Sequence, residues 1–116
     1  MDNEELERVR GIVSAIPAGS VLAYGEVAAR AGLPGRARLV GRILAEDGAD
    51  LPWHRVLRAD GTPAAHLAVE QLARLRTEGV LAEGGQVPMR RYRAGPLLPS
   101  QAPHQRRPKP PEQRCC

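Results

Sequence analysis

Apolar residues recur every three or four positions in four stretches of the chain, and this spacing places them on one face of an α-helix. A glycine or a proline follows each stretch closely, which marks where the helices end. The chain is therefore predicted to be mainly helical. The predicted helices and their inward-facing residues are 5–16 (Leu6, Val9, Val13, Ile16), 25–33 (Val27, Ala28), 36–47 (Val40, Ile43, Leu44) and 68–79 (Val69, Leu72, Leu75).

The segments between these helices show less periodicity. Residues 20–25 predict a short extended stretch or turn, and residues 48–63 predict a loop with one possible strand at 54–58. Two short apolar runs then flank Glu83-Gly84-Gly85, beyond Gly79, which is a suitable residue to end the preceding helix. This pattern predicts a β-hairpin over residues 80–92 that would serve as a wing.

The two central helices are separated only by the turn Leu33-Pro34-Gly35, which is typical of a helix-turn-helix. From Gly95 the composition changes to proline, glutamine and arginine, with few apolar residues. We therefore predict one mainly α domain over residues 1–94, a winged helix-turn-helix with a short β-hairpin wing. The Pro/Arg-rich segment 95–116 is predicted to be a disordered tail.

The composition also limits the class of protein. The 116 residues include no apolar run of the ~20 residues that a membrane span requires, and the acidic start lacks the apolar segment of a signal peptide. The only cysteines, Cys115 and Cys116, are adjacent at the end of the chain and poorly placed for a structural disulfide. We expect a cytoplasmic monomer that contacts no membrane and carries no cofactor or metal.

The distribution of charge says more than the net value of +4. Seven basic residues and one acid lie at or beyond position 90, so the rest of the chain is slightly acidic. Arg38 and Arg42 share one helical face with Gly41 beside them, which suits close approach to an anionic partner such as DNA. In the alternative, the arginines are only solvated and Gly41 packs against another helix. The acid-free stretch 29–42 contains Arg30, Arg36, Arg38 and Arg42.

Four separated blocks resemble, in order and spacing, the DNA-binding domain of the O6-alkylguanine-DNA alkyltransferases: IPAGSVLAYGEVA, GLPGRARLVG, LPWHRVL and RTEGV. The resemblance extends from about Leu6 to Arg93. In that family the turn reads Pro-Cys-His-Arg and its cysteine accepts the alkyl group, whereas this chain has Trp53 there. An indole cannot replace the activated thiolate that alkyl transfer requires. The chain therefore resembles the alkyltransferase-like proteins, which bind the lesion without repairing it.

This resemblance implies a non-enzymatic DNA damage sensor, associated with the nucleoid when it is bound to DNA. It would bind double-stranded DNA containing O6-alkylguanine through the minor groove, flip out the modified base and mark the lesion for nucleotide excision repair proteins. One alternative is a helix-turn-helix transcriptional regulator that reads undamaged DNA. A second is an enzyme, either a transferase that uses another residue or a glycosylase, for which Asp47 and Glu78 are the only candidate acids.

The same resemblance implies roles for individual DNA-binding residues. Arg38 would fill the gap left by the flipped base, although a phosphate contact is the alternative for it. Tyr24 would press on the phosphate beside the target nucleotide and help to hold the base, with plain packing as the alternative. The remaining DNA-binding residues are Arg36 and Arg42, as phosphate contacts, and the small residues Ala37 and Gly41, which would let the helix enter the groove.

The implied lesion pocket surrounds Trp53, for which an ordinary core position is the alternative. Apolar lining would tolerate different alkyl groups. His66 would hydrogen-bond to the alkylated base or stack on it, or else be an exposed loop residue. The predicted lining consists of Tyr24, Leu44, Trp53, the backbone of Val56 and Leu57, and His66.

Behind the pocket, His54 and Glu78 match the relay that activates the cysteine of the alkyltransferases. Because no thiol is present at Trp53, we interpret this pair as a structural hydrogen-bond network and predict no catalytic residue. Arg55 is predicted to tie the turn to the core. Asp47 stands near the position of the family's hinge asparagine, as an acid instead of an amide, and completes the predicted network.

Overall fold

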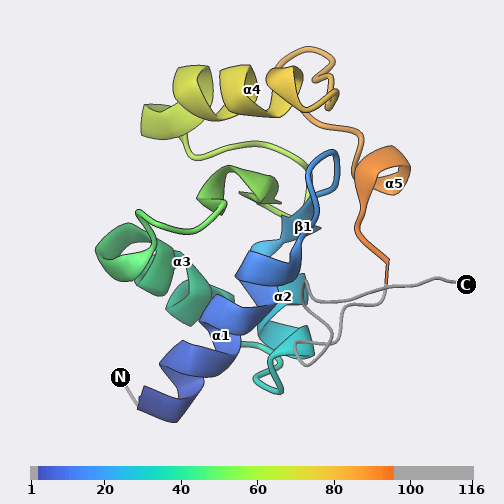
Figure 1. The fold of residues 1–116 in the computed structure, drawn as a ribbon. Helices are drawn as coiled ribbons and strands as arrows, with labels where there is room; N and C mark the ends of the chain where they lie inside the picture. Colours follow the sequence, from blue (N-terminus) through green and yellow to red (C-terminus); the bar gives the residue numbers. More distant parts are fainter. Residues whose placement is uncertain (1–2, 96–116) are drawn as a thin grey trace, which may run out of the picture.

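The computed structural model describes residues 3–95, so the prediction for the tail beyond Gly95 lies outside the described residues. Within this range, five α-helices and a two-stranded parallel sheet are joined by turns and two short 3-10 helices (Figure 1). None of the helices in residues 3–95 is long and apolar enough to cross a membrane. In chain order the elements are α1 (Asn3–Ala15), β1 (Leu22–Ala23), α2 (Tyr24–Arg30), α3 (Ala37–Asp47), η1 (Trp53–Arg55), β2 (Val56–Leu57), η2 (Ala65–Leu67), α4 (Ala68–Thr77) and α5 (Met89–Tyr92).

The helices α1, α2 and α3 pack around one aliphatic core, and the inward faces predicted for them are confirmed. Leu6 of α1 and Leu44 of α3 are only partly buried, but both pack against this core, and Leu44 also faces the cavity described below. Burial of the other aliphatic side chains is the main force that holds the three helices together. The core residues from these helices and the turn after α1 are Val9, Ile12, Val13, Ile16, Val27, Ala28, Leu39, Val40 and Ile43.

The helices α2 and α3 form the predicted helix-turn-helix. The backbone amide of Ala23 donates to Glu26 Oε1 at 2.8 Å, so α2 begins at Tyr24, one residue earlier than predicted. At the other end Gly32 adopts a φ of +80°, and the amide of Leu33 donates to the carbonyl of Ala28 at 2.8 Å. This glycine-dependent cap satisfies the last carbonyls of α2 and reverses the chain toward α3.

The two short strands join distant parts of the chain. Leu22 pairs with Val56 and Ala23 with Leu57 in parallel register, and all four residues are buried. The sequence indicated two possible extended segments but not their pairing, because strands of two residues are too short to show an alternating pattern. The pairing places the Trp53 turn, directly before β2, beside the start of α2 at Tyr24.

The helix α4 covers the Trp53 turn, and its predicted inward face is confirmed for Leu72 and Leu75 but wrong at Val69. Val69, predicted to point inward, is 89% exposed, whereas Leu75 is fully buried as expected. Gln71, one turn before Leu75, takes the inward position and is 1% exposed. Its amide donates to the carbonyls of His54 and Val56 at 3.1 and 2.7 Å. The buried backbone of the turn thus needs a polar partner at position 71, and this hydrogen bonding decides which face of α4 is inward.

The end of α4 follows the sequence prediction. Gly79 has a φ of +89°, its amide donates to Arg76 O at 3.0 Å, and the amide of Val80 donates to Leu75 O at 2.9 Å. These two bonds form a Schellman cap. The cap holds Glu78, the residue before the glycine, at the end of the helix that packs on the Trp53 turn.

The wing is smaller than predicted. Glu83 and Gln86 form one antiparallel bridge around a two-glycine turn, instead of two strands. Residues Met89–Tyr92 form the short helix α5, where the second strand was expected to continue. Pro88 lies between the bridge and α5 and prevents the second strand from continuing, because it has no amide hydrogen for a strand ladder. The domain is a winged helix-turn-helix whose wing is reduced to this single bridge.

Candidate lesion pocket and DNA-facing helix

Three of the four arginines in the basic stretch have partners within the protein. Arg36 lies 3.6 Å from Glu5 of α1, and Arg42 lies 3.2 Å from Glu46 on its own helix. Arg30 donates to backbone carbonyls near the end of the described chain. The sequence shows no acid between these arginines. Glu5 reaches Arg36 through the packing of α1, and Glu46 reaches Arg42 from the next turn of α3.

Arg38 is different. Its side chain is exposed in the first turn of α3, and within residues 3–95 it makes no hydrogen bond or ion pair. One turn later, a Cβ added to Gly41 would meet only Tyr24 Cε1, at 3.9 Å, which is ordinary van der Waals contact. Packing inside the protein therefore does not require glycine at 41, contrary to the alternative of helix packing. The helix α3 carries a free arginine and a position without a side chain one turn apart.

A cavity of about 460 Å³ lies between α3 and the Trp53 turn. It brings together four of the six residues predicted for the pocket and adds three alanines, Gly41 and Leu67, which the pocket prediction did not include. The other two predicted residues, Val56 and Leu57, do not line it, because they are fully buried in β2. The lining residues are Tyr24, Gly41, Leu44, Ala45, Ala49, Trp53, Ala64, His66 and Leu67.

The two ionisable side chains of this lining lie on different elements. Tyr24, at the start of α2, is half-buried. Burial raises the pKa of its phenol, although the positive charge of Arg58 acts in the opposite direction. Tyr24 is therefore a neutral hydrogen-bond donor at physiological pH. His66 lies in η2 with an exposed side chain that borders the cavity, and its contact with the alkylated base stays a prediction.

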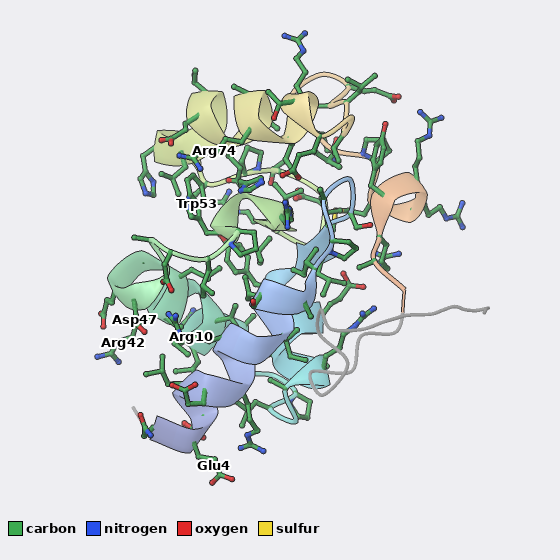
Figure 2. All side chains as sticks on the ribbon, viewed as in Figure 1. Glu4, Arg10, Arg42, Asp47, Trp53 and Arg74 are labelled. Carbon is green, nitrogen blue, oxygen red and sulfur yellow. The ribbon has the colours of Figure 1, made fainter. Side chains whose placement is uncertain are left out.

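Trp53 begins the 3-10 helix η1 and is half-buried, so it is not an ordinary core residue. Its amide donates to Leu51 O at 2.8 Å, which fixes the backbone of the turn. The ring meets His54 edge to face, with centroids 6.2 Å apart. The guanidinium carbon of Arg74, on α4, lies 5.3 Å from the ring centroid (Figure 2). Trp53 thus has the cavity on one side and a cation from α4 over its ring.

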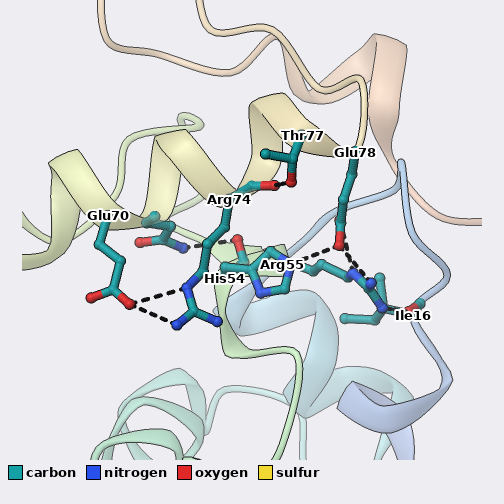
Figure 3. A network of polar contacts seen from close by, with 8 residues as sticks. Ile16, His54, Arg55, Glu70, Arg74, Thr77 and Glu78 are labelled. Carbon is teal, nitrogen blue, oxygen red and sulfur yellow. Dashed lines mark hydrogen bonds and ion pairs between the residues drawn. The ribbon is translucent and has the colours of Figure 1, made fainter.

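Behind the turn, His54, Arg55 and Glu78 form what we call the buried network (Figure 3). His54 Nε2 is 2.9 Å from Glu78 Oε2. Arg55 donates to both carboxylate oxygens of Glu78, at 3.0 and 2.6 Å, and to the carbonyl of Ile16 at 2.7 Å. As predicted, Arg55 ties the turn to the core, and it does so by joining α4 to the end of α1.

The charge of Glu78 follows from these contacts. Hydrogen bonds from Arg55 lower its pKa to about 2 against the opposing effect of burial, and His54 adds to the lowering. A carboxyl group with such a low pKa is ionised near neutral pH and accepts three hydrogen bonds. It is therefore too weak a base to take up a proton and act in acid-base catalysis. Within residues 3–95, no three acidic, histidine or cysteine side chains gather where they could bind a metal ion.

Asp47 does not belong to the buried network, contrary to the prediction. Arg10 of α1 binds the carbonyl and a carboxylate oxygen of Asp47, at 2.6 and 3.1 Å, and both carboxylate oxygens of Asp50 (Figure 2). We call these three residues the exposed clamp, because both carboxylates are more than half exposed. The clamp joins α1 to the end of α3 and to the loop before Trp53. The family resemblance assigned Asp47 to the network as the counterpart of the hinge asparagine, whereas its contact with Arg10 depends on how α1 packs against α3.

With this geometry established, comparison with known proteins identifies the family. The family described as 6-O-methylguanine DNA methyltransferase, DNA binding domain, matches residues 5–80. The chain belongs to this family. Two proteins named "DNA base-flipping protein" are relatives of this family member. The Escherichia coli protein is 46% identical over 94 residues (75% of this chain, 71% of the relative), and the Vibrio parahaemolyticus protein is 35% identical over 96 residues (78% and 96%).

Solved structures agree with this assignment. The Schizosaccharomyces pombe protein Atl1, in complex with damaged DNA containing O6-carboxymethylguanine, superposes with a TM-score of 0.72 and 30% identity, covering 83% of this chain and 99% of that one. Mycobacterium tuberculosis OGT in complex with DNA gives a TM-score of 0.57 at 28% identity, covering 81% and 55%. These neighbours are consistent with the winged helix-turn-helix prediction.

Several residues around the site were missed by sequence reasoning. Arg74, Gln71 and Arg10 all act through contacts with residues far away in the chain. The only local signal among them was Glu70, four residues before Arg74, a spacing that predicts a helix-surface ion pair but not its position over Trp53. Such residues become visible only when the helices are placed in space.

Proposed function

We propose that this protein binds O6-alkylguanine in double-stranded DNA, flips the modified base into the cavity beside Trp53 and holds it without transferring the alkyl group. The observation that carries the proposal is the pairing of a free Arg38 with a preformed cavity. Arg38 lies one helical turn before Gly41, and Gly41 already lines the cavity. A side chain that can enter the base stack and a space that can receive the base thus lie side by side.

The DNA-facing steps follow from the surroundings of each residue. Arg38 has no partner in the described part of the chain, so inserting it into DNA breaks no contact described in the free protein. Gly41 lets the helix backbone approach the minor groove closely, with Ala37 in the same role one turn earlier. Tyr24 keeps its phenolic hydrogen and can donate it to a phosphate or to the flipped base.

The absence of transfer follows from Trp53 and from the state of the buried network. Trp53 occupies the position at which the family resemblance places the acceptor cysteine, and an indole is not a thiolate nucleophile. Glu78 is a carboxylate held by Arg55 and His54, which supports a role in shaping the turn. We propose that the bound complex acts instead, as a mark that nucleotide excision repair proteins recognise. The base-flipping names of the relatives and the damaged-DNA complex of Atl1 support lesion binding.

The experiment that tests this proposal uses Trp53, the only tryptophan of the chain, as its reporter. The protein is titrated with two duplexes that are identical except for one O6-methylguanine, at one fixed salt concentration, while affinity and tryptophan fluorescence are followed. We expect tighter binding to the modified duplex with a change in fluorescence. Equal affinities with unchanged fluorescence would contradict the proposal and favour a regulator that reads undamaged DNA.

A second measurement separates binding from transfer. A duplex carrying a radiolabelled methyl group on O6 is incubated with an excess of protein, and the label on protein and DNA is counted after denaturation. We expect all label to stay on the DNA. Label on the protein would overturn the non-enzymatic assignment, and release of free modified base would indicate a glycosylase.

A further inference from the structure

Trp53 is supported by a residue that does not line the cavity. Arg74 projects from α4 toward η1, and its guanidinium carbon lies 5.3 Å from the indole centroid (Figure 2). Trp53 lines the cavity and Arg74 does not. Arg74 therefore contacts the ring from the α4 side, while the cavity lies toward α3.

Arg74 is itself held in place. Its Nε and one terminal nitrogen both donate to Glu70 Oε2, at 3.0 and 2.7 Å (Figure 3). Glu70 lies one turn earlier on α4, so the helix presets the distance between the two side chains. This two-point contact orients the planar guanidinium, which a lysine ammonium could not reproduce.

The indole needs such a support because its surroundings do not enclose it. Trp53 is half-buried, and it stands at the first position of a three-residue 3-10 helix. The three alanines of the lining are too small to restrict a large ring from the cavity side. A cation placed over an aromatic face is attracted to it, so Arg74 favours one orientation of the ring.

We propose that Arg74, oriented by Glu70, is a positioning residue that holds the Trp53 indole as a fixed wall of the cavity and thereby sets the discrimination between alkylated and normal guanine. This inference rests on the proposed function for its effect on discrimination. The positioning itself is a property of the free protein and is measured without DNA.

The first test compares Arg74→Ala with the control Arg76→Ala. Both substitutions remove one arginine from the same helix, but Arg76 is exposed and contacts neither Trp53 nor an acid in the described residues. In the free protein, Arg74→Ala should change the Trp53 emission spectrum and lower its fluorescence anisotropy, because the ring gains local motion. Arg76→Ala should leave both unchanged. Equal spectra and anisotropies for all three proteins would overturn the positioning role.

The second test measures the ratio of affinities for the alkylated and unmodified duplexes. Arg74→Ala should lower this ratio about fivefold, the loss expected from one cation–π contact, and Arg74→Lys should restore only part of it. If Arg74 were merely a phosphate contact, affinity for both duplexes would fall equally, as for Arg76→Ala, and the ratio would stay constant. That result would overturn the proposal.

Glu70→Gln separates a pure charge effect of α4 on DNA binding from a role of Glu70 in orienting Arg74. Loss of a negative charge near DNA should strengthen binding to both duplexes with an unchanged ratio if only charge matters. If Glu70 orients Arg74, the ratio should fall and the Trp53 anisotropy should decrease. Should the wild-type protein itself not discriminate between the duplexes, the proposed function fails, while the anisotropy of the free variants still decides whether Arg74 positions Trp53.

Discussion

The rear and the front of the cavity differ in whether their charged groups are paired within the protein. At the rear, the buried network satisfies both oxygens of Glu78 and ties the Trp53 turn to the end of α1. At the front, Arg38 has no partner within residues 3–95, and Gly41 leaves space that the protein does not fill. Satisfied groups stabilise the fold, whereas unsatisfied exposed groups are available to a ligand. The difference predicts that rear variants lose stability and front variants lose DNA binding.

The largest effect is expected for Glu78→Gln at the rear. This change leaves Arg55, whose side chain is 17% exposed, without a counter-charge. Removing one partner of a buried ion pair typically costs about 3–5 kcal/mol, and we expect the lower end because Glu78 retains some exposure. Urea unfolding followed by circular dichroism measures it. Unchanged stability would show that the buried network does not hold the turn.

The acid dependence of stability tests the same network without a mutation. The pKa of Glu78 is about 2 in the folded protein, below its ordinary value of 4.5, so its contribution is present above pH 4.5 and is lost as the pH falls toward 2. The shift corresponds to roughly 3 kcal/mol. Unfolding free energies measured across this window should fall for the wild type and much less for Glu78→Gln. Parallel curves for the two proteins would place the acid sensitivity elsewhere.

Arg38→Ala should give the opposite result at the front. We expect unchanged unfolding free energy and a loss of about tenfold in the affinity ratio of alkylated to normal duplex, because the flipped state loses the side chain that fills its gap. Arg42→Ala is the matched control. Arg42 is an exposed arginine of the same helix, and its loss should weaken binding to both duplexes equally. An affinity ratio that is unchanged by Arg38→Ala would show that Arg38 is not inserted into the base stack.

Gly41→Ala sharpens the comparison with a smaller change. An added methyl group meets only Tyr24 at van der Waals distance, so stability should stay equal or rise by up to about 1 kcal/mol from helix propensity. DNA affinity should nevertheless fall, because the helix can no longer approach the groove as closely. Thermal unfolding and duplex titration of one preparation measure both quantities. A loss of stability would show that the fold itself requires glycine at position 41.

Arg10→Gln is expected to have the smallest effect. The exposed clamp uses the same arginine–carboxylate chemistry as the buried network, and the hydrogen bond from Arg10 likewise lowers the pKa of Asp50. Solvent screens these exposed groups, so the loss of stability should be a minor fraction of that for Glu78→Gln and should shrink as salt is added. An effect as large as that of Glu78→Gln would mean that burial does not explain the difference between the two sites.

What the sequence determined by itself was local. The apolar spacing identified α1, α2 and α3 and their inward faces, and Gly32 and Gly79 end their helices through left-handed backbone that favours glycine. The motif blocks correctly predicted the family, and His54 and Glu78 were correctly paired because the resemblance supplied their contact. Each of these features depends on neighbouring residues or on a pattern conveyed by the family.

Only the tertiary structure decided which distant groups meet. On α4, Val69 was wrongly predicted to point inward because the carbonyls of His54 and Val56 bind Gln71 instead, and the apolar spacing of α4 carries no information on that backbone. Asp47 was assigned to the wrong network because Arg10 approaches it from α1. Tertiary packing likewise decided the parallel pairing of β1 with β2, the alanines that line the cavity and the position of Arg74 over Trp53. Side-chain spacing describes one element at a time, whereas these contacts depend on how separate elements are placed when the core is buried.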